Sequence, residues 1–194
     1  MKRKPELDTL RGLAILLMVA DHLFLFADAP ALWRAVTRPA FPLFFLVSGL
    51  LFRERGRGPS RLRLVQIGLA GVLTSMLLAN HGAARFGFPD ICVIWLMAYG
   101  IWWSVGRRAP LATLVLVPVL WFVEPWLFGP VWTNHPLASG VLWMTVGGFV
   151  HVPNRCRVRV LAWVGRYPLA WYLTHLWLLV GLDRFRVPVR WLPL

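Results

Sequence analysis

Residues 6–26 read ELDTLRGLAILLMVADHLFLF, an apolar run that carries Asp8, Arg11, Asp21 and His22 and is long enough to cross a bilayer. Charged or titratable groups inside a spanning helix are costly, so they indicate function by default. Arg11 and His22 are separated by about three helical turns, so they share a face at depths roughly 16 Å apart. Asp8 lies near that face, whereas Asp21 lies about 100° round the helix from His22. The run therefore predicts a membrane helix with an acid, a fixed cation and an imidazole on one stripe.

The composition excludes an ordinary soluble domain. The chain has 194 residues, of which 58% are hydrophobic, and 12 tryptophans, most of which we assign to the membrane–water interfaces. A net charge of +13 is typical of nucleic-acid binding in a soluble protein, but here the basic residues fall mainly in short loops between apolar runs. We expect one integral membrane domain over residues 1–194, with the lipid bilayer as partner and no nucleic acid. Cys92, in an apolar run, and Cys156, in a basic loop, predict neither a disulfide nor a metal site.

Apolar segments recur along the chain and predict an all-α, polytopic transmembrane bundle of about seven helices. Pro118 and Pro125 predict a kink or an early end in the fifth segment. Bundles of six or eight helices remain alternatives. The segments are residues 9–26, 39–52, 64–80, 91–105, 111–128, 137–152 and 160–182.

The basic loops predict the orientation of this bundle. A cytoplasmic N-terminus places most loop arginines and lysines inside, as the positive-inside rule requires, apart from Arg184, Arg186 and Arg190 in the tail. The alternative for the first segment is a signal peptide cleaved near Ala29, but Asp21, His22 and Pro30 argue against it. We therefore expect a multi-pass protein of the inner cell membrane.

Five polar residues are expected at similar depth in the outer third of the membrane: Asp21, His22, Arg38, Tyr172 and His175. A histidine beside a carboxylate is the usual equipment of a general base, and an arginine stabilises an anion or a developing oxyanion. Structural roles are the alternative, with the histidines bonding neighbouring helices, Arg38 anchoring an interface and Arg11 reaching the cytoplasmic surface.

The densest basic run, residues 53–63 with sequence RERGRGPSRLR, is first a topology signal. Phosphate binding by its arginines is the second interpretation. These arginines are Arg53, Arg55, Arg57, Arg61 and Arg63.

Several of these stretches resemble a known group of enzymes. LDTLRGLAILLMVADHLF at residues 7–24, with Arg11 and His22, resembles the opening helix of the acyltransferase-3 superfamily of integral membrane acyltransferases. FFLVSGLLF at 44–52 is similar to that superfamily's second helix, and GRYPLAWYLTHLWLL at 165–179 to its late Tyr-Leu-x-His helix. The patterns at residues 18–22 and 38–44 resemble the TraX-type pilin acetylases, and the heparan-glucosaminide acetyltransferases begin similarly. The branch stays open, and residues 64–160 add little to the match.

The resemblance implies transfer of an acetyl group from acetyl-CoA, or another acyl-CoA, which acts as a co-substrate reached from the cytoplasm. The acceptor is a hydroxyl or amine on the outer side, from a sugar, a cell-envelope glycan or a pilin or peptide N-terminus. His22 would act as the base or carry the acyl group, Asp21 or Arg38 would orient it, and Arg38 or His175 would steady the oxyanion. The arginines of residues 53–63, and Arg11, would hold the phosphates of coenzyme A. The competing class is a non-enzymatic small transporter or membrane-assembly factor that uses the same buried charges.

Overall fold

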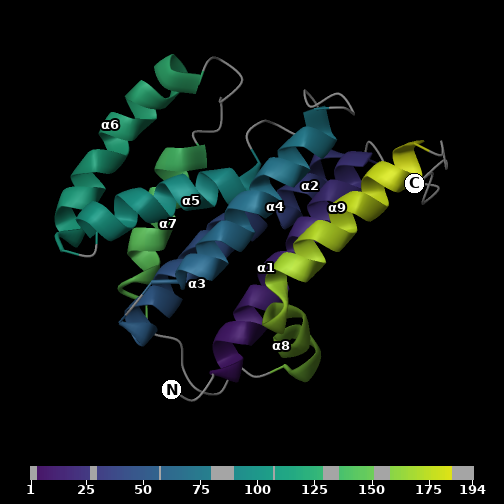
Figure 1. Cartoon of the computed structure of the whole chain (residues 1–194), viewed down its shortest axis with the longest axis horizontal. Coiled ribbons are helices and arrows are strands. Elements are labelled where there is room, and N and C mark those ends of the chain that lie inside the picture. The colour runs from purple at the N-terminus through teal and green to yellow at the C-terminus, as the bar shows by residue number, and fades with distance from the viewer. Residues whose placement is uncertain are drawn as a thin grey trace. The chain divides into compact units, whose positions relative to one another are not determined.

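The computed structural model describes residues 4–26, 30–56, 58–79, 90–106, 108–128, 136–150 and 158–184, and every regular element within these ranges is a helix (Figure 1). The predicted all-α class is therefore confirmed. The elements are α1 (Pro5–Phe26), α2 (Ala31–Thr37), α3 (Ala40–Arg55), α4 (Arg61–Ala79), α5 (Ile91–Ile101), the π-helical turn η2 (Trp102–Gly106), α6 (Pro110–Phe128), α7 (Pro136–Gly147), α8 (Arg159–Arg166) and α9 (Pro168–Arg184).

Hydropathy located the helices of the first six apolar segments to within a few residues, apart from the end of α7. The fifth segment runs from Pro110 to Phe128 as α6, so neither Pro118 nor Pro125 ends it. The loop expected before Arg38 contains the seven-residue helix α2, which is too short for hydropathy to reveal.

The predicted single helix over residues 160–182 is wrong. The chain leaves the helical conformation at Tyr167, whose φ is −124° and ψ is 56°, and α9 begins at the next residue, Pro168. Proline disfavours the helical conformation of the residue before it and is well suited to the first position of a new helix. Pro168 therefore divides the segment into α8 and α9.

One helical stretch in the described part of the chain, Ala35–Arg55, is long and apolar enough to cross a membrane by its length and composition. Shorter apolar helices occupy Ile91–Gly106, Pro110–Glu124 and Leu137–Gly147. The seven-span bundle and the cytoplasmic N-terminus stay predictions.

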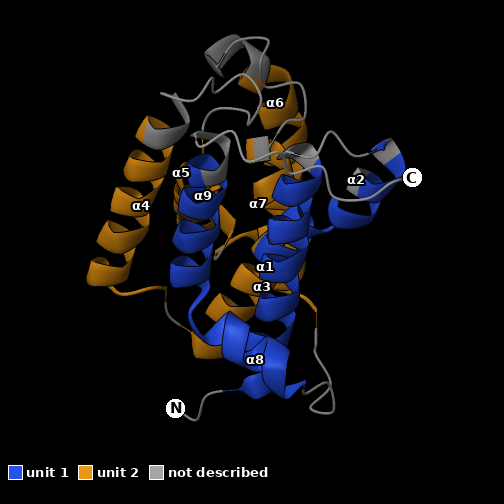
Figure 2. Cartoon of the chain, turned by 90° about the vertical axis from the view of Figure 1, so that its right-hand side faces the viewer, with its two compact units in different colours: residues 1–44, 152–194 blue, residues 45–151 orange. Residues whose placement is uncertain are grey.

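The chain divides into two compact units (Figure 2). Unit 1 comprises Met1–Phe44 and Val152–Leu194, and unit 2 comprises Phe45–His151. Within unit 1, α1 packs against α2, α8 and α9; within unit 2, α5 packs against α4 and α7, and α6 packs against α7. That the whole chain forms a single domain stays a prediction.

Unit 1 is built around a very close crossing of α1 and α8. A Cβ on Gly12 would overlap the carbonyl oxygen of Leu161, and a Cβ on Gly165 would overlap the carbonyl oxygen of Asp8. Each helix thus places a glycine against a backbone carbonyl of the other helix. On each helix, the glycine comes four residues after the carbonyl that the partner glycine contacts. Glycine is needed at both positions because only the absence of a side chain permits this approach.

Unit 2 contains a second crossing of the same kind, between α3 and α7. A Cβ on Gly49 would overlap the Met144 carbonyl oxygen, and a Cβ on Gly147 would overlap that of Leu46. The indole N–H of Trp95 donates to Ser48 Oγ at 2.9 Å and so joins α5 to α3. These contacts fix α3 against α5 and α7.

Candidate functional site

Two histidine rings meet in unit 1, one from α1 and one from α9. His175 Nε2 lies 3.3 Å from His22 Nδ1, and the ring centroids are 5.2 Å apart. His175 is 6% exposed, whereas His22 is half-buried. The two histidines are 153 residues apart in sequence, and the packing of α9 on α1 brings them together.

The hydrogen bonds of the pair determine which nitrogens carry protons. His22 Nδ1 lies 2.9 Å from the Met18 carbonyl oxygen, and His175 Nδ1 lies 3.0 Å from that of Trp171. A carbonyl oxygen only accepts, so both Nδ1 atoms carry hydrogen. In two neutral rings His175 Nε2 then accepts from His22 Nδ1–H, which is shared between two acceptors. The lone pair of the His22 ring is consequently on Nε2, the nitrogen suited to act as a base.

Tyr172 joins the pair from α9. Its ring is 6% exposed, and its centroid lies 5.6 Å from that of His175 in an edge-on arrangement. Of the residues predicted to meet, the structure brings together His22, His175 and Tyr172. Within the described ranges no three His, Cys, Asp or Glu residues gather in a way that could hold a metal ion.

Asp21 bonds to α2. Thr37 Oγ1 donates to its carboxylate at 2.6 Å, which ties α2 to α1. Arg38 follows Thr37 in the chain and is exposed in the turn before α3. The sequence predicted that Arg38 lies at similar depth to Asp21 and His22, and it missed the buried hydroxyl of Thr37 one residue earlier, for which the only signal was its polar character beside an apolar stretch.

Arg11 lies at the crossing of α1 and α8. Its Nη1 is 3.2 Å from Asp8 Oδ1 and donates to the Gly165 carbonyl oxygen at 3.2 Å. A cation at one of the last carbonyls of α8 complements the negative end of that helix. Arg11 is about three turns of α1, roughly 16 Å, from His22 and is therefore not part of the ring pair.

The predicted phosphate-binding arginines lie in unit 2. Arg53 and Arg55 are exposed at the end of α3, and Arg61 is exposed at the start of α4. Arg63 is half-buried, and its Nη1 donates to Gln66 Oε1 at 3.3 Å. Arg57 and Cys156 lie outside the described residues. The run thus presents three exposed guanidinium groups within the described part.

Glu124 is a buried acid of α6 for which the sequence predicted no partner. Its carboxylate accepts from the backbone N–H groups of Leu137, at 2.8 Å, and Ala138, at 3.1 Å. A carboxylate of α6 therefore caps the first turn of α7 and complements its positive end. Glu124 stabilises unit 2, and only its charge within an apolar segment could have drawn attention to it.

Comparison with known proteins bears on the first part of the chain. No curated protein and no solved structure matches it. Residues 6–81, which hold α1 to α4 with Arg11, Asp21, His22, Arg38 and the basic run, match the family model described as TraX protein, whereas α9 with His175 lies beyond the match.

Proposed function

We propose that the protein is a membrane acyltransferase of the TraX type, which moves an acetyl group from acetyl-CoA to an amine or hydroxyl. The observation that carries the proposal is the contact of His22 with His175. We assign the pair the tautomer that leaves the His22 lone pair on Nε2. The match of residues 6–81 to the TraX family supports the same reaction class.

The reaction follows from the positions of the protons. His22 Nε2 removes a proton from the acceptor nitrogen or oxygen, which attacks the thioester carbonyl carbon and forms a tetrahedral oxyanion. The carbon–sulfur bond then breaks, and the thiolate of coenzyme A takes the proton from the His22 imidazolium. We assign His175 the role of a positioning residue. Its Nε2 accepts from His22 Nδ1–H, and its own Nδ1–H donates to the Trp171 carbonyl oxygen.

Tyr172, which is 6% exposed, brings a phenol ring against His175. Tyr172 lies three residues before His175 on the same face of α9, so its phenol ring lies beside the ring of His175. A phenolic O–H is suited to stabilise an oxyanion. We assign it this role and place the acceptor, an envelope glycan or a peptide N-terminus, on the outer side of the inner membrane.

The test is release of free thiol from acetyl-CoA by the detergent-purified full chain, with and without an amine acceptor. His22→Asn keeps an N–H donor near the position of Nδ1 and removes the basic nitrogen. We expect it to lower kcat by about 10²- to 10⁴-fold, the usual contribution of a positioned base. Leu23→Ala, at the exposed neighbour on α1, is the matched control and should keep wild-type kcat.

Full activity in His22→Asn would remove His22 from the mechanism. If a folded wild type neither releases thiol nor binds acetyl-CoA, the protein is not an acyltransferase. A transporter or membrane-assembly factor would then be the favoured function.

A further inference from the structure

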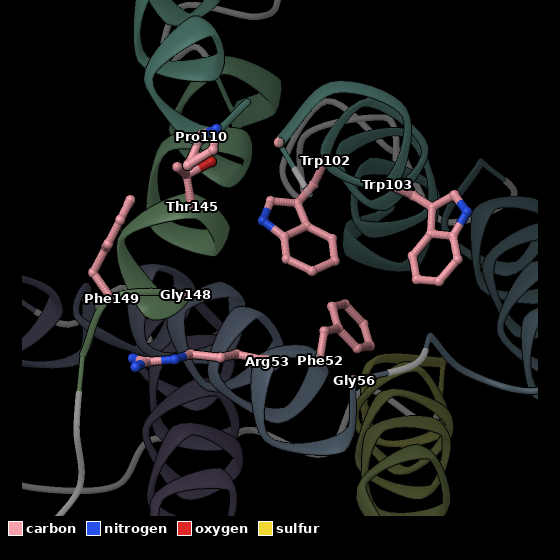
Figure 3. A pocket seen from close by; sticks show the side chains of 10 residues that line it. Phe52, Arg53, Gly56, Trp102, Trp103, Pro110, Thr145, Gly148 and Phe149 are labelled. Carbon is pink, nitrogen blue, oxygen red and sulfur yellow. The ribbon is translucent and has the colours of Figure 1, made fainter. Parts of the chain in front are cut away.

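Unit 2 contains a cavity of about 230 Å³ whose lining includes four aromatic residues and one arginine (Figure 3). Phe52 and Arg53 enter from the end of α3, and Trp102 and Trp103 enter from η2. The volume is below the roughly 300–1,000 Å³ of a site that encloses a whole drug-sized ligand. The cavity therefore suits one end of a larger molecule, such as a bicyclic ring and its first substituent.

The local backbone is specialised to present these rings. Trp102 and Trp103 open the π-helical turn η2, a rare conformation that is frequent at functional sites. A Cβ on Gly106 would come within 2.8 Å of Trp102 Cδ1 and 3.0 Å of Thr113 Oγ1, so a glycine is required to keep the Trp102 indole in place. Opposite, Gly56 has a φ of +61° and ends α3, where its N–H donates to the Arg53 carbonyl oxygen at 3.1 Å.

The aromatic wall is held by further ring contacts behind it. The Phe52 and Trp102 centroids lie 5.3 Å apart, and those of Tyr99 and Trp103 lie 5.8 Å apart. Trp95 stacks on Tyr99 with an interplanar angle of 6°. Rings packed in this way keep their orientation, so the cavity offers preformed flat surfaces to a planar ligand.

Arg53 lies at the end of the cavity away from Trp102 and Trp103. Figure 3 shows its side chain extended along one edge, with the guanidinium on the side of Gly148 and Phe149 and away from the two indoles. A guanidinium is the preferred partner of phosphate, and aromatic faces bind nucleobases by stacking. The cavity thus separates a stacking surface from an anion-binding group, as a base and its phosphate are separated in a nucleotide.

We infer that this cavity binds a purine nucleotide, with the base on the Phe52, Trp102 and Trp103 rings and a phosphate on Arg53. Coenzyme A ends in such a nucleotide, so the inference, which rests on the proposed function, assigns the cavity to the far end of the acyl donor. The cavity, at about 230 Å³, is too small for the whole acyl donor, so the remaining part of the donor lies outside it.

The first experiment measures binding of adenosine 3′,5′-bisphosphate to the detergent-purified full chain by equilibrium dialysis. Trp103→Ala and Arg53→Gln should each raise Kd about tenfold or more, because each removes one of the two contacts. The matched controls are Trp121→Ala and Arg159→Gln, exposed residues outside the cavity lining, which should leave Kd unchanged. Equal Kd values in all variants, or displacement of the nucleotide by phosphatidylglycerol with no loss in Arg53→Gln, would overturn the inference in favour of a lipid headgroup or another site.

The second experiment separates this inference from the proposed function. The wild type should use acetyl-CoA with a lower KM than S-acetylpantetheine, which lacks the nucleotide, and Arg53→Gln should abolish that preference with kcat retained. Nucleotide binding without any acetyl transfer would support the cavity and contradict the proposed function. Acetyl transfer with an unchanged preference in Arg53→Gln would contradict the cavity alone.

Discussion

Glu124 shows how one side chain stabilises unit 2. Its carboxylate is 1% exposed and accepts two backbone N–H groups at the start of α7. A charged group in a buried position is stabilising only while its hydrogen bonds are kept, since a buried donor without a partner costs about 1–3 kcal/mol.

Substitution of this acid should be markedly destabilising. In Glu124→Gln one amide oxygen replaces two carboxylate oxygens, so we expect the free energy of unfolding to fall by about 1.5–3 kcal/mol. Thermal unfolding of the detergent-purified protein measures the change. Glu6→Gln, at a half-buried acid in the first turn of α1, is the control and should cost less than about 1 kcal/mol. Equal stability of Glu124→Gln and the wild type would show that the cap is not needed.

At the same scale, the sequence predicted some partners and missed others. The proximity of His22, His175 and Tyr172 followed from equal depth in two expected helices, because their titratable character marked them within apolar runs. The partners of Asp21 and Glu124 could not be found in this way. Thr37 and the α7 backbone carry no charge, and their contacts depend on how one helix packs on the next helix in the chain.

The reciprocal glycine contacts act at the scale of the element. On an open helix surface Gly→Ala stabilises by about 0.5–1 kcal/mol because alanine loses less chain entropy. At Gly12 the new methyl group would overlap the Leu161 carbonyl oxygen, and such overpacking costs about 1–3 kcal/mol or more, so the clash should dominate.

Gly12→Ala should therefore lower the midpoint of thermal unfolding and weaken the α1–α8 contact. Gly181→Ala is the matched control in the same unit, because no heavy atom lies within 4 Å of its added Cβ, and it should leave the midpoint unchanged or raise it. A Gly12→Ala protein as stable as Gly181→Ala would contradict the close crossing described here.

Helix positions were largely predictable because each apolar segment is bounded by polar, glycine or proline residues. The division of α8 from α9 was also encoded, by Pro168, but hydropathy alone treats a proline in an apolar run as a continuation. The π-helical turn at Trp102 could not be predicted, since it depends on the packing of the indoles and of Gly106.

At the scale of the whole molecule, apolar side chains cover the outer faces of two helices. On α4 they include Leu69, Val72, Leu73 and Met76, which are 51–62% exposed. On α6 they include Leu111, Val115, Val119 and Phe122, which are 51–75% exposed. Exposed apolar faces of this length are unusual in soluble proteins and indicate contact with lipid or another apolar surface.

The protein should consequently remain with the membrane fraction after extraction at alkaline pH, which removes peripheral proteins, and should be released only by detergent. Release by alkali would contradict the integral membrane assignment. The composition alone predicted this class, whereas the number of spans depends on helix lengths and ends that hydropathy does not set.

The most direct test of the central claim is a double-mutant cycle on the histidine pair, with kcat for acetyl transfer as the readout. His175→Gln removes the ring that orients His22 and should lower kcat less than His22→Asn does. If the rings act as one unit through the Nε2–Nδ1 hydrogen bond, the double variant should be no slower than His22→Asn alone. Losses that multiply would contradict the pair as the working unit, and show two histidines that act independently.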